Sequence, residues 1–215
     1  MEATAERFPS VAHGVRVFHR LGTIGVWKKM QRELYFQARK QAKRKRRPSI
    51  VIVDSQSVRT GKMGGERGYD GGKRVKGRKR HIVVDSLGLP LAVSVTAANV
   101  HDLRGGKRAL KLTKKFLRRG SFNKVYADGA YNSQPFRNWL KKTFDATLQV
   151  SKNLAQKFKR FIPASQRWVV ERTFAWFYDF RRLTIDYERL TQHSRFMMRF
   201  AAISLMLNRL APASA

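Results

Sequence analysis

A continuous run of β-branched residues, Ile50 to Val53, sets the strongest constraint on how this chain can fold. Because the run has no polar face, it predicts a short strand buried on both sides of a sheet and covered by helices. The run ends in a carboxylate, Asp54, and a second short apolar run, Lys124–Ala127, ends in another, Asp128. The sequence therefore predicts a helix-covered sheet whose buried strands finish in acidic residues.

The remaining elements follow from changes of hydrophobic period along the chain. Two apolar runs, His81–Ser86 and Leu89–Thr96, predict a hairpin that turns at Gly88. The Gly-rich basic stretch from Gly61 to Arg80 predicts no packed element. Helices are expected over two segments in residues 1–36, then from Asp102 to about 118, 134–142, 164–183 and 191–210, with a weak strand at 146–150. This order predicts an α/β fold, a mixed sheet flanked by helices in the order of a ribonuclease H-like domain, preceded by a short helical N-terminal segment.

The charge of the chain restricts its partners. Lys and Arg number 46 against 14 Asp and Glu, which gives a formal net charge of +32. A field of this sign attracts polyanions, so nucleic acid is the expected partner, an anionic membrane surface is the weaker alternative, and an ordinary metabolic enzyme is nearly excluded. The absence of cysteine excludes disulfides and thiolate zinc sites. The longest apolar stretch, Phe196–Leu210, is shorter than the roughly 20 residues that a membrane span needs, so a cytoplasmic protein is expected.

A basic segment divides the chain. Residues 37–48 are rich in Lys and Arg and end in Pro48, which disfavours helix at the preceding residue. We therefore place a domain boundary here, with a helical segment and basic linker in residues 1–47 and the α/β domain in residues 48–215.

Three acidic residues are candidates for chemistry. A carboxylate at the end of a buried strand is costly to desolvate unless a cation or hydrogen-bond donors compensate it, and Mg²⁺ prefers such hard oxygen ligands. Asp54 and Asp128 are in this position, although either could instead form a turn or cap a helix. Glu171 lies on an expected helix four residues after Arg167, where a simple helical ion pair is the alternative. Asp85 precedes a tight turn and is assigned to capping that turn.

Five sequence blocks together carry a family resemblance. They are IVDSQSV (52–58), GYDGGKRVKGRKRHIVVDSLGLPL (68–91), AANVHD (97–102), YADGAY (126–131) and WVVERTFAWFYDFRRL (168–183). In this order they resemble the bacterial insertion-sequence DDE transposases, more specifically the insertion-sequence-five group. The resemblance implies a ribonuclease H-like catalytic domain in which Asp54, Asp128 and Glu171 bind two Mg²⁺ ions, with Mn²⁺ as a substitute. It also implies cleavage at the ends of a mobile element and transfer of the freed 3′ hydroxyl into target DNA.

The resemblance also implies partners and a cellular place. They are double-stranded DNA, as terminal repeats and target, a homodimer on that DNA, and the nucleoid in the cytoplasm. Residues 13–36 resemble only the last part of the family's helical DNA-binding region, so residues 1–47 are expected to be a partial DNA-binding segment. A non-catalytic nucleic-acid binder, an inactive truncated remnant and a plain nuclease of the same fold remain as alternatives.

Basic side chains near the expected catalytic residues are candidates for phosphate contact, because Lys and Arg release counterions from DNA. Trp168 and Trp176 are expected to pack in the core, and His81 and His101 to be structural. The expected DNA-binding residues are Lys73, Arg74, Lys76, Arg78, Lys79, Arg80, Arg167, Arg172, Arg181 and Arg182.

Overall fold

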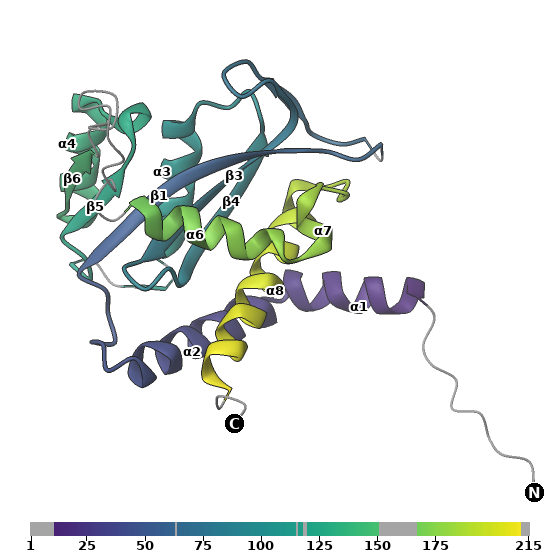
Figure 1. Cartoon of the computed structure of the whole chain (residues 1–215), viewed down its shortest axis with the longest axis horizontal. Helices are drawn as coiled ribbons and strands as arrows, with labels where there is room; N and C mark the ends of the chain where they lie inside the picture. Colours follow the sequence, from purple (N-terminus) through teal and green to yellow (C-terminus); the bar gives the residue numbers. More distant parts are fainter. Residues whose placement is uncertain (1–10, 63, 115, 118–119, 151–166, 212–215) are drawn as a thin grey trace, which may run out of the picture.

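The computed structural model describes residues 11–62, 64–114, 116–117, 120–150 and 167–211. A curved mixed sheet lies at its centre, with helices packed against it (Figure 1). The strands are β1 (Ile50–Arg59), β2 (Gly68–Asp70), β3 (Val75–Asp85), β4 (Pro90–Ala97), β5 (Lys124–Ala127) and β6 (Thr147–Val150).

The strand order defines the fold class. β3 pairs antiparallel with β1 on one side and with β4 and β2 on the other, while β5 pairs parallel with β1 and β6 parallel with β5. Four antiparallel strands thus continue into two parallel ones, with β1 in the middle. This is the ribonuclease H-like arrangement that the sequence predicts.

Helices cover both faces of the sheet. They are α3 (Asp102–Thr113), α4 (Gln134–Phe144), α6 (Arg167–Tyr178), α7 (Arg181–Thr184) and α8 (Thr191–Leu210). Arg80 and His81 follow one another on β3, so their side chains point to opposite faces. Arg80 donates to the Leu183 carbonyl of α7, whereas the His81 ring lies directly under Gly105 of α3. We conclude that α3 covers one face and the α6–α7 region the other, where α6 runs along β1 (Figure 1).

The N-terminal helices pack against the same core as the sheet. α1 (Val11–Thr23) leads through a turn at Gly25 into α2 (Val26–Gln41), which lies against α8. Tyr35 of α2 is fully buried in the main core, and Arg39 forms a buried ion pair with Asp85 at the end of β3. The sequence boundary at residue 47 therefore marks a change in composition, while α2 packs as part of the α/β unit.

Most of the predicted elements are confirmed, with corrections. β1 does not end at Asp54 but continues to Arg59, and the helix expected over 164–183 is divided, within the described residues, into α6 and α7. The hairpin turns at Gly88, whose φ of 79° favours glycine, and Asp85 accepts hydrogen bonds from the turn amides of Leu87 and Leu89. The prediction that residues 61–80 form no packed element is wrong, because β2 and the first half of β3 lie there. Arg78 and Arg80 can enter the sheet because buried oxygen atoms from residues 183–189 receive their guanidinium groups.

No helix within the described ranges has both the length and the apolar character needed to cross a lipid bilayer.

Candidate active site

Asp54 and Asp128 are placed side by side by the pairing of two central strands. β1 and β5 are parallel, and their last paired residues are Ile52 and Tyr126. Two residues further along each chain come Asp54 and Asp128. Residues two apart point to the same face, and parallel neighbours lie about 4.8 Å apart, so this register directs both carboxylates to one face of the sheet. Strand register therefore places the two predicted acids on the same face.

Backbone amides hold both carboxylates in place. Asp54 is largely buried, and its Oδ1 accepts a hydrogen bond of 2.7 Å from the Ser55 amide. Asp128 Oδ1 accepts one of 3.1 Å from the Ala130 amide and so caps the short 3₁₀ helix η1 (Gly129–Tyr131). The capping role considered for Asp128 is thus present, and it uses only one of the two carboxylate oxygens.

The Tyr131 side chain lies near three carboxylates. Its ring is fully buried, and its hydroxyl has no hydrogen-bond partner among the described residues. Burial is the main reason that the pKa of Tyr131 is raised well above its usual value, and the negative charges of Asp54, Asp102 and Asp128 raise it further. The phenol is therefore kept neutral, and Asp102 is one of the charges near it together with the two predicted aspartates.

Asp102, where the sequence predicts that a helix begins, makes contacts beyond that helix. The cap of α3 is His101, whose ring accepts from the Leu103 amide, and Asp102 is the first helical residue. Asp102 Oδ1 accepts a hydrogen bond of 2.6 Å from the Ser55 hydroxyl and lies 3.1 Å from Lys79 Nζ. Burial alone would raise the pKa of Asp102, but these two donors lower it, so the group is held as a carboxylate.

Lysines border the acidic site on the strand side. Lys79 Nζ bridges Asp102 to Asp70, at 3.2 Å from Asp70 Oδ2. Lys73 is exposed and donates to the Ser55 carbonyl at 3.1 Å, directly after Asp54 in the chain. Burial opposes ionisation of Asp70, but donors that include Ser57 and Lys79 lower its pKa to about 2. These lysines therefore carry positive charge next to the carboxylates.

The structure corrects half of a predicted basic DNA-binding loop. Lys73, Arg74 and Lys76 are exposed as expected. Arg78, Lys79 and Arg80, in contrast, are almost completely buried on β3, because their cationic groups are bound to the Asp186 carboxylate, to the acids described above and to backbone carbonyls. These three side chains stabilise the fold and are not a surface for the DNA backbone.

Arg172 also has a structural role. Its guanidinium lies between the rings of Trp168 and Trp176, at 4.5 and 4.7 Å from their centroids, and donates to the Leu87 carbonyl. The expectation that both tryptophans pack in the core is therefore wrong: Trp168 is 49% exposed, and the pair holds an arginine at the surface of the β3–β4 turn.

The other predicted basic residues divide into two groups. Arg181 and Arg182 of α7 are exposed, and Arg182 pairs with Glu188 at 3.0 Å. The Arg167 side chain lies outside the described residues. The exposed candidates for phosphate contact are therefore Lys73, Arg74, Lys76, Arg181 and Arg182.

Glu171 lies on α6, the helix that runs along β1, and its side chain is exposed. The neighbouring Val169 and Val170 are buried in the core and fix the rotation of the helix. α6 therefore sets the position of Glu171, on the face of the sheet that α6 covers.

The donor set of the site suits a hard divalent cation. Asp54 on β1 and Asp128 directly after β5 supply carboxylate oxygens near the buried Tyr131 hydroxyl, which lacks a hydrogen-bond partner within the described ranges.

A separate group of potential metal ligands, which contains histidine, occurs elsewhere in the molecule. Within those ranges, the only three His, Asp or Glu side chains with ligand atoms all within 4.8 Å of one another are His19, Glu188 and His193. The carboxylate oxygens of Asp54, Asp102 and Asp128 therefore do not all lie within 4.8 Å of one another.

The strand order, with Asp54 on β1 and Asp128 directly after β5, defines a ribonuclease H-like domain with an acidic site at its central strands. The transposase DDE domain family matches residues 45–207, which include all five sequence blocks and the three predicted acids. The chain therefore belongs to the transposase DDE domain family, whose members are polynucleotidyl transferases or nucleases.

Two similar proteins give further context. The chain is 36% identical over 127 residues to a putative transposase for insertion sequence element IS402 from Burkholderia cepacia, covering 53% of this chain and 54% of that protein. The chain thus spans about half the length of the curated relative it matches. The solved Mos1 strand transfer complex covers 84% of this chain and 61% of its own, with 12% identity and a TM-score of 0.30, a similarity too low to support an argument.

Proposed function

We propose that this chain is the catalytic part of an insertion-sequence transposase, which cuts DNA at the ends of its element and joins the freed 3′ hydroxyl to target DNA. The observation that carries the proposal is the register of β1 and β5, which directs Asp54 and Asp128 to one face of the sheet. Membership of the transposase DDE domain family supports it. The finer assignment to the insertion-sequence-five group remains a prediction from the sequence blocks.

We assign divalent metal binding to Asp54, Asp128 and Glu171, with two Mg²⁺ ions as the physiological cofactor and Mn²⁺ as a substitute. Such ions, when bound, lower the pKa of water and neutralise charge on a phosphodiester. The protein's own part is to hold the carboxylates: the Ser55 and Ala130 amides fix the two aspartates in orientation.

Double-stranded DNA is the proposed partner, both as terminal repeats and as target. The exposed cations Lys73, Arg74, Lys76, Arg181 and Arg182, with Arg167, are proposed to contact phosphates beside the acidic site. Residues 1–47 are proposed to add DNA contacts through the basic linker. A homodimer on DNA and a location at the nucleoid in the cytoplasm complete the proposal.

Cleavage and strand transfer on a duplex that carries an element end test this function. Asp54→Asn, Asp128→Asn and Glu171→Gln should each lower both reactions by about 10²-fold or more, as loss of a preorganised electrostatic group does in other active sites. Asp179→Asn is the matched control, because Asp179 is an exposed carboxylate just after α6. It should retain the parental rate.

The same assay separates the alternatives. A parent protein that binds the duplex and neither cuts nor joins it, at any Mg²⁺ or Mn²⁺ concentration, would contradict catalysis and identify a binder or an inactive remnant. Cutting without joining would identify a plain nuclease.

A further inference from the structure

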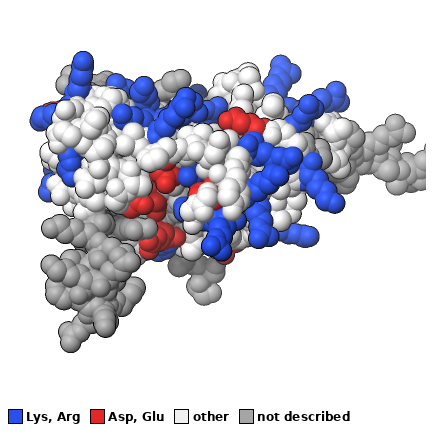
Figure 2. Space-filling view, turned by 90° about the horizontal axis from the view of Figure 1, so that it is seen from above, with Lys and Arg blue, Asp and Glu red and all other residues white. Residues whose placement is uncertain are grey.

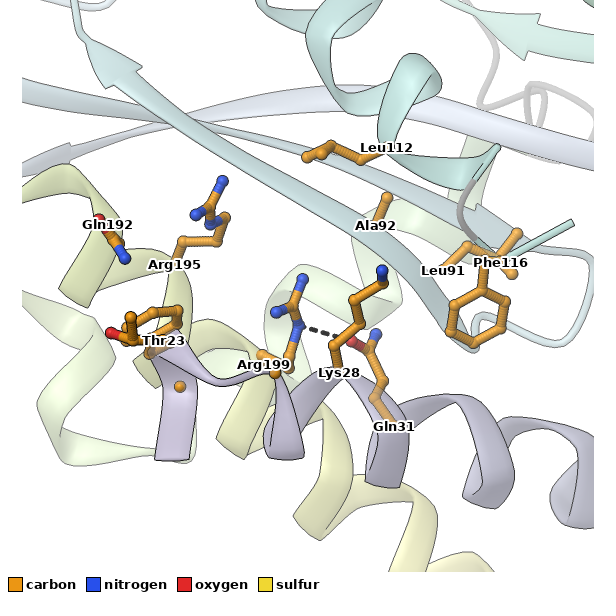
Figure 3. Close-up of a pocket in the computed structure, with 13 residues that line it drawn as sticks. Thr23, Lys28, Gln31, Leu91, Ala92, Leu112, Phe116, Gln192, Arg195 and Arg199 are labelled. Atoms are coloured by element: carbon orange, nitrogen blue, oxygen red, sulfur yellow. Dashed lines mark hydrogen bonds between the residues drawn. The ribbon is translucent and has the colours of Figure 1, made fainter. Parts of the chain in front are cut away.

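A cavity of about 280 Å³ lies where the N-terminal helices meet the sheet domain. The α1–α2 turn and α2 form one wall, α8 forms another, and β4 and the end of α3 close the third (Figure 3). It is separate from the acidic site, which lies at Asp54 and Asp128. Nothing in the proposed function uses this cavity.

Three cationic side chains line the cavity. Lys28 comes from α2, and Arg195 and Arg199 come from α8, one helical turn apart. Figure 3 shows the three side chains extending in the same direction from the two helices toward β4. Neither Asp nor Glu occurs among the residues that line it, as far as the structure describes them.

A buried glutamine fixes the direction of Arg199. Gln31 is almost completely buried, donates to the Pro90 carbonyl at 2.8 Å, and accepts from Arg199 Nε at 3.0 Å. The dashed line in Figure 3 marks this second contact. Because Nε is held by Gln31, the position of the guanidinium is set before any ligand arrives.

Both arginines are partly buried, and no carboxylate among the described lining residues neutralises them. Burial lowers the pKa of Arg199 to about 10, with a further contribution from the charge of Arg195, and burial also lowers the pKa of Arg195. The buried Arg195 Nε has no hydrogen-bond partner among the described residues. A buried cation usually has a partner, so this arrangement has the charge of an anion site.

A neighbouring cavity extends the positive surface. It shares Leu112, Gln192 and Arg195 with the first and adds Arg108 and Lys111 from α3, again with no acid in its described lining. Its wall also includes Thr191 and Gln192, in the first turn of α8, where no side chain caps the helix. The uncapped amides and the helix dipole add partial positive charge to the same groove.

We propose that this groove binds phosphate groups, with Arg195 and Arg199 as paired donors and Lys28 as a point charge. Guanidinium groups match phosphate oxygens through parallel hydrogen bonds, and desolvation strengthens each one. The phosphate can come from a DNA backbone, in which case the inference deepens the proposed function, or from a free polyphosphate. Pyrophosphate is the probe that carries the shared chemistry.

Thermal unfolding of the full chain with and without pyrophosphate tests the proposal. Saturating pyrophosphate should raise the Tm of the parent by about 5 °C, because a ligand that binds only the native state stabilises it. Arg195→Gln and Arg199→Gln should lose most of that shift. Arg20→Gln on α1 and Lys29→Gln on α2 remove the same charge from exposed positions outside the groove and should keep it. Lys28→Gln, beside the Lys29 control, should reduce the shift.

The melting of Arg195→Gln without ligand serves as its folding control. Removing one of two neighbouring cations should leave its Tm at or above that of Arg20→Gln, so loss of the pyrophosphate shift would report binding and not unfolding. A pyrophosphate shift that persists in both Arg195→Gln and Arg199→Gln, or its absence in the parent, would overturn the proposal.

DNA titrations distinguish the source of the phosphate. If the groove holds DNA, Arg195→Gln should lower the slope of log K against log salt by about 1, and pyrophosphate should compete with the duplex. If it holds a free polyphosphate, that slope should stay at the parental value while the pyrophosphate shift is lost. Asp54→Asn should keep the pyrophosphate shift, so failure of the catalytic proposal would be seen separately.

Discussion

At the scale of single residues, the β3–β4 turn depends on one buried carboxylate. Asp85 accepts hydrogen bonds from the Leu87 and Leu89 amides and from the Tyr35 hydroxyl, and it pairs with Arg39. The turn-capping role predicted from the sequence is confirmed, and the two partners on α2 add a link that no local pattern indicates. Because the Asp85 side chain is completely buried, loss of the Arg39 cation leaves a charge that water cannot reach.

We expect Arg39→Met to destabilise the protein by about 3–5 kcal/mol, the cost of leaving one partner of a buried ion pair alone. Urea denaturation measures this change. Arg32→Met is the control on the same helix, since Arg32 and its partner Glu33 are both exposed, and it should cost no more than about 1 kcal/mol. Equal losses in the two variants would contradict the role given to Asp85.

His81 gives the residue-scale expectation for pH. It is fully buried and lies 3.1 Å from the Thr96 hydroxyl. Burial, opposed by Asp102 and assisted by neighbouring cations such as Lys79, lowers its pKa to about 4. The unfolded chain takes up this proton near pH 6.5, but the native protein does so only near pH 4. As the pH is lowered from 6.5 to 4, the free energy of unfolding should therefore decrease by up to about 3 kcal/mol.

Denaturation midpoints between pH 7 and 4.5 check this expectation. His81→Gln should flatten the profile, whereas His13→Gln, at an exposed position, should leave it unchanged. His193, whose pKa is also lowered by burial and by His19, contributes with the same sign and remains in both variants. A profile in His81→Gln as steep as the parental one would contradict the assignment.

At the scale of elements, two adjacent glycines let α3 approach the sheet. A Cβ on Gly105 would lie 2.0 Å from His81 Nε2, and one on Gly106 would lie 2.4 Å from the Tyr131 ring. Glycine inside a helix costs about 1 kcal/mol relative to alanine. Glycine is needed at both positions because a larger side chain would push α3, and Asp102 at its start, away from the strands that carry the aspartates.

Gly105→Ala should therefore destabilise the protein by about 1–3 kcal/mol, as overpacking of a close contact does. Gly14→Ala in α1 should instead be neutral or stabilise by about 0.5–1 kcal/mol, because open space surrounds that position. Chemical denaturation of the two variants measures the difference. The proposed packing requires opposite signs or at least a clear gap between them.

The elements that could be predicted from sequence are those with a local signal. The β-branched run of β1, the Gly88 hairpin and the amphipathic helices show their period within a few residues. The first half of β3 could not be predicted, because the carbonyl groups and Asp186 that receive Arg78 and Arg80 come from about 100 residues further along the chain. Asp54 and Asp128 were identified as the ends of apolar runs, but only Asp128 follows the end of its strand, because β1 continues past Asp54 to Arg59. Asp102 and Tyr131 were missed as site residues, although both lie in the family blocks.

At the scale of the whole molecule, positive charge is spread widely and negative charge is concentrated. Figure 2 shows Lys and Arg side chains across one face, with the few acidic side chains gathered toward its middle. Buried ion pairs such as Arg78 with Asp186 use part of the small acidic content of a chain whose formal net charge is +32. Such a surface should hold DNA mainly through its phosphates.

DNA affinity should therefore fall steeply with salt, by about 10³–10⁵-fold between 50 and 200 mM if six to ten phosphates are contacted. Fluorescence anisotropy on a labelled duplex measures it. Arg74→Gln, at an exposed position, should lower the slope of log K against log salt by about 1. Binding that is insensitive to salt would contradict a contact dominated by phosphate charge.

The attachment of α2 also determines how this catalytic unit can be recombined with other DNA-recognition modules. A chimaera joined within the basic linker at residues 42–48 would replace Tyr35 and Arg39. The buried Asp85 carboxylate would then lose both of these partners. A junction at the α1–α2 turn, where Gly25 has a φ of 87° and open space around it, keeps α2 with the sheet. The exchangeable unit therefore begins at α2, one helix earlier than the basic linker suggests.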